Sequence, residues 1–138
     1  MVLVCSYKPE HFDGVRALWE EVFPNDPPWN RAELAIPAKL EVQPNLFLVA
    51  ELDGAVIGTV MAGYDGHRGW LYTVATKPAR QRTGVASALV REAERILREL
   101  GCTKVNLQIR AGNAAVTGFY RHHGYGIEDM ISMGKRIG

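Results

Sequence analysis

Hydrophobic residues recur at two spacings along the chain, and these spacings divide it into helices and strands. Three stretches with apolar positions three or four residues apart predict helices that bury one side; they are residues 9–23, 85–100 and 114–122. In the second stretch the apolar positions are Val85, Leu89, Ala93, Ile96 and Leu100. A fourth helix is predicted over residues 31–42, with Asn30 as its N-cap. Pro37 inside it predicts a kink or two shorter pieces.

Runs of apolar, β-branched and aromatic residues predict strands between these helices; they are residues 1–7, 46–52, 55–61, 70–75 and 104–109. Asp53-Gly54 joins the second and third runs and predicts a tight hairpin turn. Residues 70–75 are nearly all apolar or β-prone, which predicts a strand in the interior of its sheet. Two more short strands are predicted within residues 125–136, around Glu128-Asp129.

The predicted order is β-α-α-β-β-β-α-β-α-β-β, which indicates an α/β fold (α+β) with a mixed sheet and helices on its faces. At 138 residues, the chain is expected to form one domain, residues 1–138. Its composition, 47% hydrophobic and 22% charged, is typical of a soluble globular protein. No apolar run approaches the ~20 residues of a membrane span, and the N-terminus shows no signal peptide. We therefore expect a cytoplasmic protein with no membrane partner.

Charge and cysteine content argue against several functions. A net charge of +1 gives no support for nucleic-acid binding, which usually needs a strongly basic domain. Cys5 and Cys102 are the only cysteines and lie far apart, which argues against a disulfide framework or a zinc site and fits a reducing compartment. We expect no metal and no nucleic-acid partner. The oligomeric state is left open, a homodimer included.

The segment 74–90 combines the end of a strand, a basic turn and a helix that begins at Gly84. Main-chain N–H groups at a helix start have no partner inside the helix, and the helix dipole adds partial positive charge there. With cationic side chains beside it, from Lys77, Arg80 and Arg82, the turn suits a phosphate or pyrophosphate. It is neither a Walker A loop nor a dinucleotide fingerprint. Taken by itself, the turn is explained equally well as an ordinary strand-to-helix connection.

Two segments taken together resemble the GNAT superfamily of acetyl-CoA-dependent N-acetyltransferases. Gln81-x-x-Gly84-x-Ala86 matches its Q/R-x-x-G-x-G/A pyrophosphate motif. Asn113, followed by Phe119-Tyr120 and Gly124-Tyr125, fits its second motif, in which an asparagine precedes F/L-Y-x-x-x-G-F/Y. The resemblance covers residues 46–136. The run GYDGHRG and the tail MGKR are also similar to small bacterial acetyltransferases of the YpeA type, and IRAGNAA to the enzyme that acetylates a ribosomal protein's N-terminus.

The resemblance implies a role for each matching residue. The strand Val74-Ala75-Thr76 would pair with the pantetheine arm of acetyl-CoA, the acetyl donor. The turn and first helical turn would hold the pyrophosphate; these residues are Gln81, Arg82, Thr83, Gly84, Val85, Ala86 and Ser87. Asn113 would contact the pantetheine region, and it also suits an N-cap. Tyr120 would contact coenzyme A near its sulfur and donate a proton to the departing thiolate, whose charge develops only in the transition state; a core aromatic is the alternative reading of Tyr120.

Both positions that supply a general base in such enzymes depart from the pattern. The ribosomal-protein enzyme has glutamate where this chain has Gln108, and another branch has glutamate where this chain has Trp70. Glutamine and tryptophan cannot take up a proton, yet an ammonium must lose one before it attacks. We expect an ordered water instead, held by Glu51, Tyr72 or Gln108.

The resemblance therefore predicts an acetyl-CoA-dependent N-acetyltransferase in which a primary amine attacks the thioester directly. The amine would belong to a small molecule, a protein N-terminus or a lysine. The sequence offers neither an activated cysteine nor a serine–histidine pair, so nothing in it indicates a covalent acyl-enzyme. The missing base leaves an alternative, a catalytically weak module that senses acyl-CoA. Acceptor choice is expected to come from the first two helices and the loop at residues 24–29.

Overall fold

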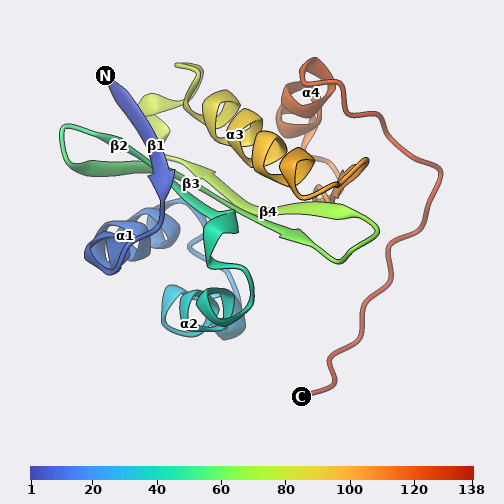
Figure 1. Ribbon diagram of the computed structural model, residues 1–138, viewed down its shortest axis with the longest axis horizontal. Coiled ribbons are helices and arrows are strands. Elements are labelled where there is room, and N and C mark those ends of the chain that lie inside the picture. Colours follow the sequence, from blue (N-terminus) through green and yellow to red (C-terminus); the bar gives the residue numbers. More distant parts are fainter. The chain divides into compact units, whose positions relative to one another are not determined.

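Five strands form one mixed sheet in the order β1-β2-β3-β4-β5 (Figure 1). The computed structural model describes residues 1–138. The strands are β1 (Val2–Ser6), β2 (Phe47–Leu52), β3 (Ala55–Tyr64), β4 (Gly69–Thr76) and β5 (Val105–Leu107). Neighbours from β1 to β4 are antiparallel, and β5 lies parallel to β4. This confirms the predicted mixed sheet with β4 in its interior.

The helices are α1 (Phe12–Val22), α2 (Ala32–Val42), α3 (Val85–Glu99) and α4 (Ala114–His122). Short 3-10 turns precede α1, α2, β2 and α3, at Pro9–His11, Pro28–Asn30, Pro44–Leu46 and Pro78–Arg80. The chain divides into two compact units, Met1–Gln108 and Ile109–Gly138. In the first unit, α1 and α2 cover one face of the sheet and α3 covers the other (Figure 1). No helix is both long and apolar enough to cross a membrane.

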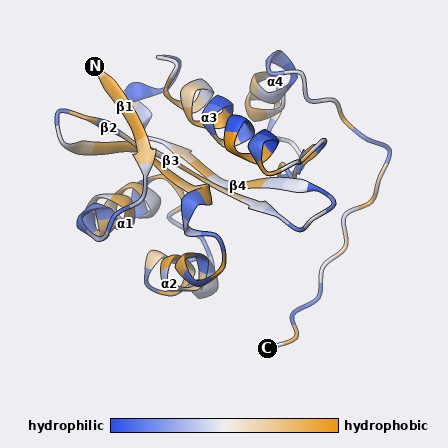
Figure 2. Cartoon of the chain, viewed as in Figure 1, coloured by the Kyte–Doolittle hydropathy of each residue, from blue (hydrophilic) through white to orange (hydrophobic).

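The core beneath α1 and α2 is built on aromatic side chains. The Phe47 ring stacks between Tyr7, with centroids 4.6 Å apart, and Trp19, at 6.0 Å. Val15 and Ile36 pack against the same cluster and are almost fully buried. Hydrophobic colouring runs along the strands, as Figure 2 shows. Trp19 therefore belongs to the core.

The opposite face of the sheet packs closely against α3. Its buried residues are Val85, Leu89, Val90, Ala93 and Leu97. Two of the predicted apolar positions differ, because Ile96 is only partly buried and Leu100 is 46% exposed. Leu97, not Leu100, continues the four-residue spacing, and Leu100 already caps the helix end. A Cβ at Gly58 would lie 2.9 Å from both Leu89 Cδ1 and Val85 Cγ1, so the glycine permits this close approach.

The predicted second helix differs at its start and in its continuity. The N-cap of α2 is Arg31, not Asn30, which belongs to the preceding 3-10 turn. The helix is assigned as one element with Pro37 inside it, not as two pieces. Proline removes one N–H bond there, and packing of buried Ala32 and Ile36 on the sheet side offsets that loss.

Polar side chains at the end of α2 join it to the last residues of β3. Lys39 is 6% exposed, and its Nζ donates a hydrogen bond to the carbonyl of Ala62. The same Nζ lies 5.3 Å from the centroid of the Tyr72 ring. Gln43 bonds the backbone of Tyr64 twice, donating to its carbonyl and accepting from its N–H, both at 3.0 Å. Burial lowers the pKa of the Lys39 ammonium to about 8.

The predicted hairpin is confirmed, and the predicted C-terminal strands are wrong. Asp53 and Gly54 both have positive φ, 51° and 80°, as a tight I′ turn requires. Residues 125–138 contain no helix or strand. Their apolar residues do not alternate strictly, and two short strands without a sheet neighbour are not stable alone. Four apolar residues of this segment are 73–91% exposed, namely Ile127, Met130, Ile131 and Met133.

We expect the Gly58→Ala substitution to lower the free energy of unfolding by ~1–3 kcal/mol, because the added methyl group overpacks the α3 interface. Urea denaturation followed by circular dichroism measures this. Gly63→Ala on the same strand is the control, since its Cβ would have only ordinary contacts, the nearest at 3.6 Å. Equal stability of the two variants would contradict the packing described.

The pH dependence of stability should depend on Lys39. Its folded pKa of about 8 lies below the ordinary value of 10.5, so the burial cost is fully present below pH 8. Between pH 8 and 10.5 the unfolded chain binds a proton that the folded chain does not, and stability contributed by this group rises with pH. Relative to Lys39→Met, the wild-type protein should gain about 1–3 kcal/mol over that range. Urea denaturation of both proteins at pH 7 and pH 10 measures this. The same difference in unfolding free energy between wild type and Lys39→Met at both pH values would contradict the prediction.

Candidate functional site

The turn between β4 and α3 exposes a run of main-chain N–H groups. Arg82 and Gly84 both have positive φ, 65° and 89°, which turns successive amides outward. The first helix bond runs from Ala88 N to Gly84 O, 3.0 Å apart. Before this bond, five successive main-chain N–H groups have no acceptor, those of Arg82, Thr83, Gly84, Val85 and Ala86. The prediction that α3 begins at Gly84 is confirmed, and the turn can accept several anionic oxygens.

Charge around this turn also favours an anion. The first turn of α3 carries no acidic residue, although Asp and Glu are common at that position. The side chains of Arg80 and Arg82 are exposed and have no carboxylate partner. Lys77 is partly neutralised by Glu21 of α1, with Nζ 3.7 Å from Oε1. Two uncompensated guanidinium groups therefore remain beside the exposed amides.

Just before this turn, β4 is distorted. Thr59 pairs with Ala75 and Met61 with Tyr72, so Thr73 and Val74 together face Val60 alone. The extra residue makes a β-bulge, and Thr73 has a φ of +50°, which is unusual for a β-branched residue. Such bulges redirect the strand and its side chains.

A buried hydrogen-bond chain holds the distortion. Trp19 Nε1 donates to Thr59 Oγ1 at 2.9 Å, and Thr59 Oγ1 donates to the carbonyl of Thr73 at 3.3 Å. Thr59 is 0% exposed, so both of its bonds are shielded from water. The α1 core therefore fixes the carbonyl of the strained residue.

Beyond the bulge, β4 has an open edge. The ladder with β5 covers only Gly69 to Leu71, paired with Val105 to Leu107. Residues 72–76 of β4 have no strand neighbour on that side within the sheet. This edge includes Val74, Ala75 and Thr76, the residues expected to pair with an extended ligand. Unpaired main-chain groups on a strand edge can bond such a ligand as an added strand would.

A cavity of about 530 Å³ lies between α2 and the strands β3 and β4. Its lining from the helix side and the preceding turn is Asn30, Ala35, Ala38, Lys39, Val42 and Gln43. The lining from the strands is Met61, Gly63, Tyr64, Asp65, Trp70, Tyr72 and Thr73. Thr73 belongs to both the cavity and the bulge. The cavity therefore meets the open edge of β4 at the distorted residue.

The two charged side chains of the cavity lie at different depths. Lys39 is buried, whereas Asp65 is exposed on the β3–β4 turn. Asp65 Oδ1 accepts the N–H groups of His67 at 2.8 Å and Arg68 at 2.7 Å. These bonds hold the pKa of Asp65 below its ordinary range. Asp65 therefore stabilises its own turn by bonding to the backbone.

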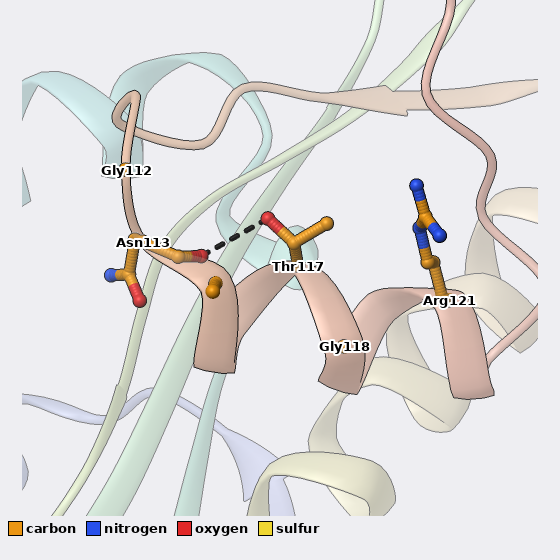
Figure 3. Close-up of a pocket in the computed structure, with 6 residues that line it drawn as sticks. Gly112, Asn113, Thr117, Gly118 and Arg121 are labelled. Carbon is orange, nitrogen blue, oxygen red and sulfur yellow. Dashed lines mark hydrogen bonds between the residues drawn. The ribbon is translucent and has the colours of Figure 1, made fainter.

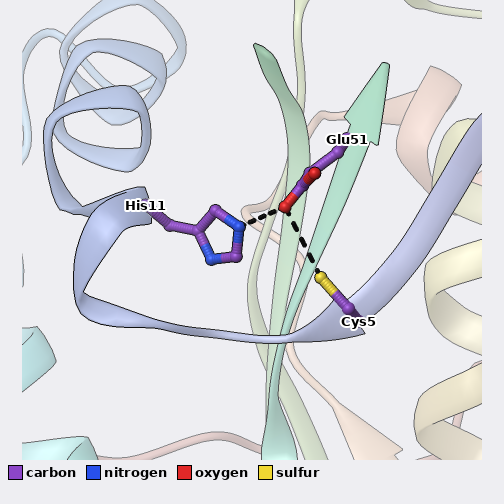
Figure 4. Close-up of side chains that lie close together, drawn as sticks. All are labelled: Cys5, His11 and Glu51. Carbon is purple, nitrogen blue, oxygen red and sulfur yellow. Dashed lines mark hydrogen bonds and ion pairs between the residues drawn. The ribbon is translucent and has the colours of Figure 1, made fainter. Parts of the chain in front are cut away.

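The candidates for holding a catalytic water occupy different places. Tyr72 lines the cavity; Glu51 and Gln108 do not. Glu51 lies instead between β1 and the turn before α1, where His11 and Cys5 both point to it (Figure 4). His11 Nδ1 accepts the Lys8 N–H at 2.9 Å, so Nε2 carries the proton and donates to Glu51. This bond lowers the pKa of Glu51.

The ligand atoms of Cys5, His11 and Glu51 lie within 4.8 Å of one another, close enough to hold a metal ion. A metal on His11 Nε2 would need the proton on Nδ1, which faces the Lys8 N–H instead. The thiol proton points to the carboxylate, with Sγ 3.7 Å from Oε1, and burial raises the pKa of Cys5. Hydrogen bonds from a thiol and an imidazole N–H to the Glu51 carboxylate therefore explain the cluster better than metal coordination.

In the second unit, Asn113 caps α4 as predicted. Its Oδ1 accepts the Val116 N–H at 3.3 Å, and its carbonyl accepts the Thr117 hydroxyl at 3.0 Å (Figure 3). Small residues along one side of α4 leave a hollow of about 400 Å³ that ends at Arg121. This face combines a helix start, little steric obstruction and one cation.

Tyr120 lies on the same helix and is 6% exposed. Its ring makes edge contacts with Phe119, centroids 4.9 Å apart, and Tyr125, at 5.6 Å. Burial raises the pKa of its phenol to about 12, so the proton stays in place at neutral pH. The packing fits a core aromatic, and the retained proton fits a proton donor; both readings remain consistent with Tyr120.

Sequence reasoning missed two residues of the site, Lys39 and Thr73. Lys39 follows Ala32 and Ile36 at helical spacing on the buried side of α2, and this charge among apolar positions could have identified it. Thr73 gave no local signal, because its left-handed backbone arises from pairing with β3. No residue of the expected acceptor loop, 24–29, lines the cavity, whereas the adjacent Asn30 does.

Comparison with known proteins places these features in a family. A protein named acetyltransferase from Pectobacterium atrosepticum is 41% identical over 131 residues, 95% of this chain and 92% of that protein. A protein of the same name from Yersinia enterocolitica is 42% identical over the same length and coverage. Among solved structures, AAC(6')-Iy in complex with a CoA-containing bisubstrate analogue is similar, with a TM-score of 0.82, 19% identity and 99% of each chain covered. That likeness shows the fold.

The family model of the acetyltransferase (GNAT) family matches residues 12–125. The match contains the exposed amides before α3, the open edge of β4 and the cap of α4. The chain is therefore an acetyltransferase of the GNAT family.

Proposed function

We propose that this enzyme transfers the acetyl group of acetyl-CoA to a primary amine by direct attack on the thioester. The observation that carries the proposal is the run of five main-chain amides, from Arg82 to Ala86, without an acceptor at the start of α3. A pyrophosphate supplies the oxygens that these groups lack. The arginines beside it supply charge-assisted bonds.

The open edge of β4 supports the place of the donor's arm. Pantetheine contains two amide groups in an extended chain, and residues 74–76 offer unpaired main-chain groups on a strand edge. An arm paired there runs from the turn at Gly84 toward the bulge at Thr73, since β4 leads from one to the other. The thioester then lies near the bulge, where the cavity begins.

The cavity supports an acceptor site on the α2 side of β4. Its volume of about 530 Å³ is that of a small-molecule pocket. Its aromatic lining includes Trp70 and Tyr72, which are 38% and 41% exposed and so available to a ligand. These features favour a small-molecule amine over a protein N-terminus or lysine.

The reaction requires two proton movements. The amine attacks the carbonyl carbon, the new C–N bond forms, and the C–S bond breaks as the thiolate leaves. The amine proton passes to a water in the cavity, beside Tyr72, because no carboxylate is freely available there. Tyr120 supplies a proton to the thiolate, consistent with a phenol that stays protonated at neutral pH.

Release of free thiol from acetyl-CoA across a panel of amines tests the proposal. Amine-dependent release would support it. Tight acetyl-CoA binding without release from any amine would support the alternative, a module that senses acyl-CoA. No binding of acetyl-CoA at all would contradict both.

We expect Gly84→Val to weaken CoA binding by about tenfold or more, because valine does not adopt a φ of +89° and the amides would turn away from the pyrophosphate. Isothermal titration calorimetry measures the affinity. Gly54→Val, at a φ of +80° on the β2–β3 turn, pays a similar backbone cost and should bind CoA normally. Equal affinities would remove the turn from the binding site.

Tyr120→Phe should lower kcat about 100-fold or more while leaving acetyl-CoA affinity unchanged, because only the proton of the leaving-group step is lost. Steady-state thiol release and calorimetry separate the two quantities. The control is Tyr125→Phe, which removes a hydroxyl from the neighbouring ring and should keep turnover. Normal turnover in Tyr120→Phe would leave this residue a packing role alone.

A further inference from the structure

Lys39 is a buried cation whose position the fold alone does not explain. Its one hydrogen bond goes to the carbonyl of Ala62, although an ammonium can donate three. Burying a charged group usually costs more than a single hydrogen bond returns, and the lowered pKa of Lys39 reports that cost. A methionine of similar length would pack in the same place without it. Lys39 also lines the cavity, so its remaining donors are within reach of a ligand.

We propose that the acceptor of this enzyme is an amine that also carries a carboxylate, and that Lys39 at the base of the cavity binds this carboxylate. The inference rests on the proposed function and specifies its substrate class. A carboxylate beside Lys39 replaces the water lost on burial with a charge-assisted bond. One ammonium matches the single negative charge of a carboxylate.

The remaining polar groups of the cavity leave Lys39 as the one charged anchor. Both ends of the Gln43 amide are bonded to Tyr64. Asp65 is exposed and its Oδ1 is taken by two backbone N–H groups. The cavity therefore has no buried carboxylate to hold a second ammonium. A polycationic amine would place an unpaired positive charge near Lys39, which is unfavourable.

The walls of the cavity determine which chemical groups suit the remainder of the acceptor molecule. Trp70 and Tyr72 offer partly exposed aromatic faces, and Ala35, Val42 and Met61 add apolar surface. The Lys39 ammonium already lies over the Tyr72 ring, 5.3 Å from its centroid. An amino acid with an apolar or aromatic body fits this combination, with its carboxylate on Lys39 and its amine toward Thr73.

The first test compares amino acids with their own amides as acceptors. Phenylalanine and phenylalaninamide form one pair, and further pairs place the amine two or three carbons from the carboxylate. Spermidine represents polycationic amines. Thiol release should give a kcat/KM about 10- to 100-fold higher for at least one acid than for its amide. The amide has the less basic amine, so intrinsic reactivity at neutral pH favours it and cannot produce this preference.

The second test locates the preference at Lys39. In Lys39→Met, the KM of the preferred acid should rise to that of its amide, with little change in kcat or in the kinetics of the amide. A residue that only supports the fold would alter both acceptors alike. Lys39→Arg keeps the charge and should keep part of the preference.

A binding measurement on the wild-type protein tests the inference without any variant. With CoA bound in place of acetyl-CoA, calorimetry of 3-phenylpropionate and its amide, which carry no amine of their own to titrate, at pH 8 in two buffers of different ionisation enthalpy gives the protons exchanged. The acid should take up more protons than the amide, because a carboxylate raises the pKa of Lys39 from about 8. Equal proton exchange by acid and amide would contradict the inference.

The outcomes separate this inference from the function on which it rests. Amides acetylated as well as their acids, or spermidine acetylated best, would overturn the carboxylate anchor and leave the acetyltransferase intact. No thiol release with any amine would overturn the proposed function, and the acceptor assignment with it. A preference for acids that survives in Lys39→Met would remove Lys39 from the acceptor site.

Discussion

One extra residue in β4 determines how the site is arranged. Thr73 and Val74 occupy the space opposite Val60, and the strand beyond this bulge has no partner on its β5 side. The bulge gives the chain two features at one point, a free strand edge that leads to the amides before α3 and a cavity against α2. A regular ladder would have paired those main-chain groups internally and left nothing for a ligand.

The polar interior supports this distortion at some cost to stability. Trp19 and Thr59 bond in sequence to the carbonyl of Thr73, so a core tryptophan and a fully buried threonine hold a strained residue in place. Lys39 is a second buried polar group, joined to the neighbouring strand at Ala62. Lys39 and the strained Thr73 both line the same cavity, and strain and buried charge commonly collect where a protein binds or reacts.

Prediction from the sequence succeeded where the signal was local. The turn at Asp53-Gly54 and the start of α3 at Gly84 need positive φ, which few residues other than glycine tolerate, so composition reveals them. The cap at Asn113 is equally local. Prediction failed for residues 125–136, because two strands form only where a partner accepts their hydrogen bonds. Which leucine ends the buried side of α3 depended on its packing against the sheet.

The sequence by itself determined the helices and strands up to residue 122, their order and the two motifs that indicate the GNAT family, because glycine placement, capping and periodicity act over a few neighbouring residues. Tertiary structure alone decided that β4 carries a bulge, that Glu51 is paired with His11 and that Lys39 faces a cavity. Each of these depends on groups brought together from distant segments. The energy of such a pairing depends on a partner far along the chain, so the local pattern of residues does not reveal it.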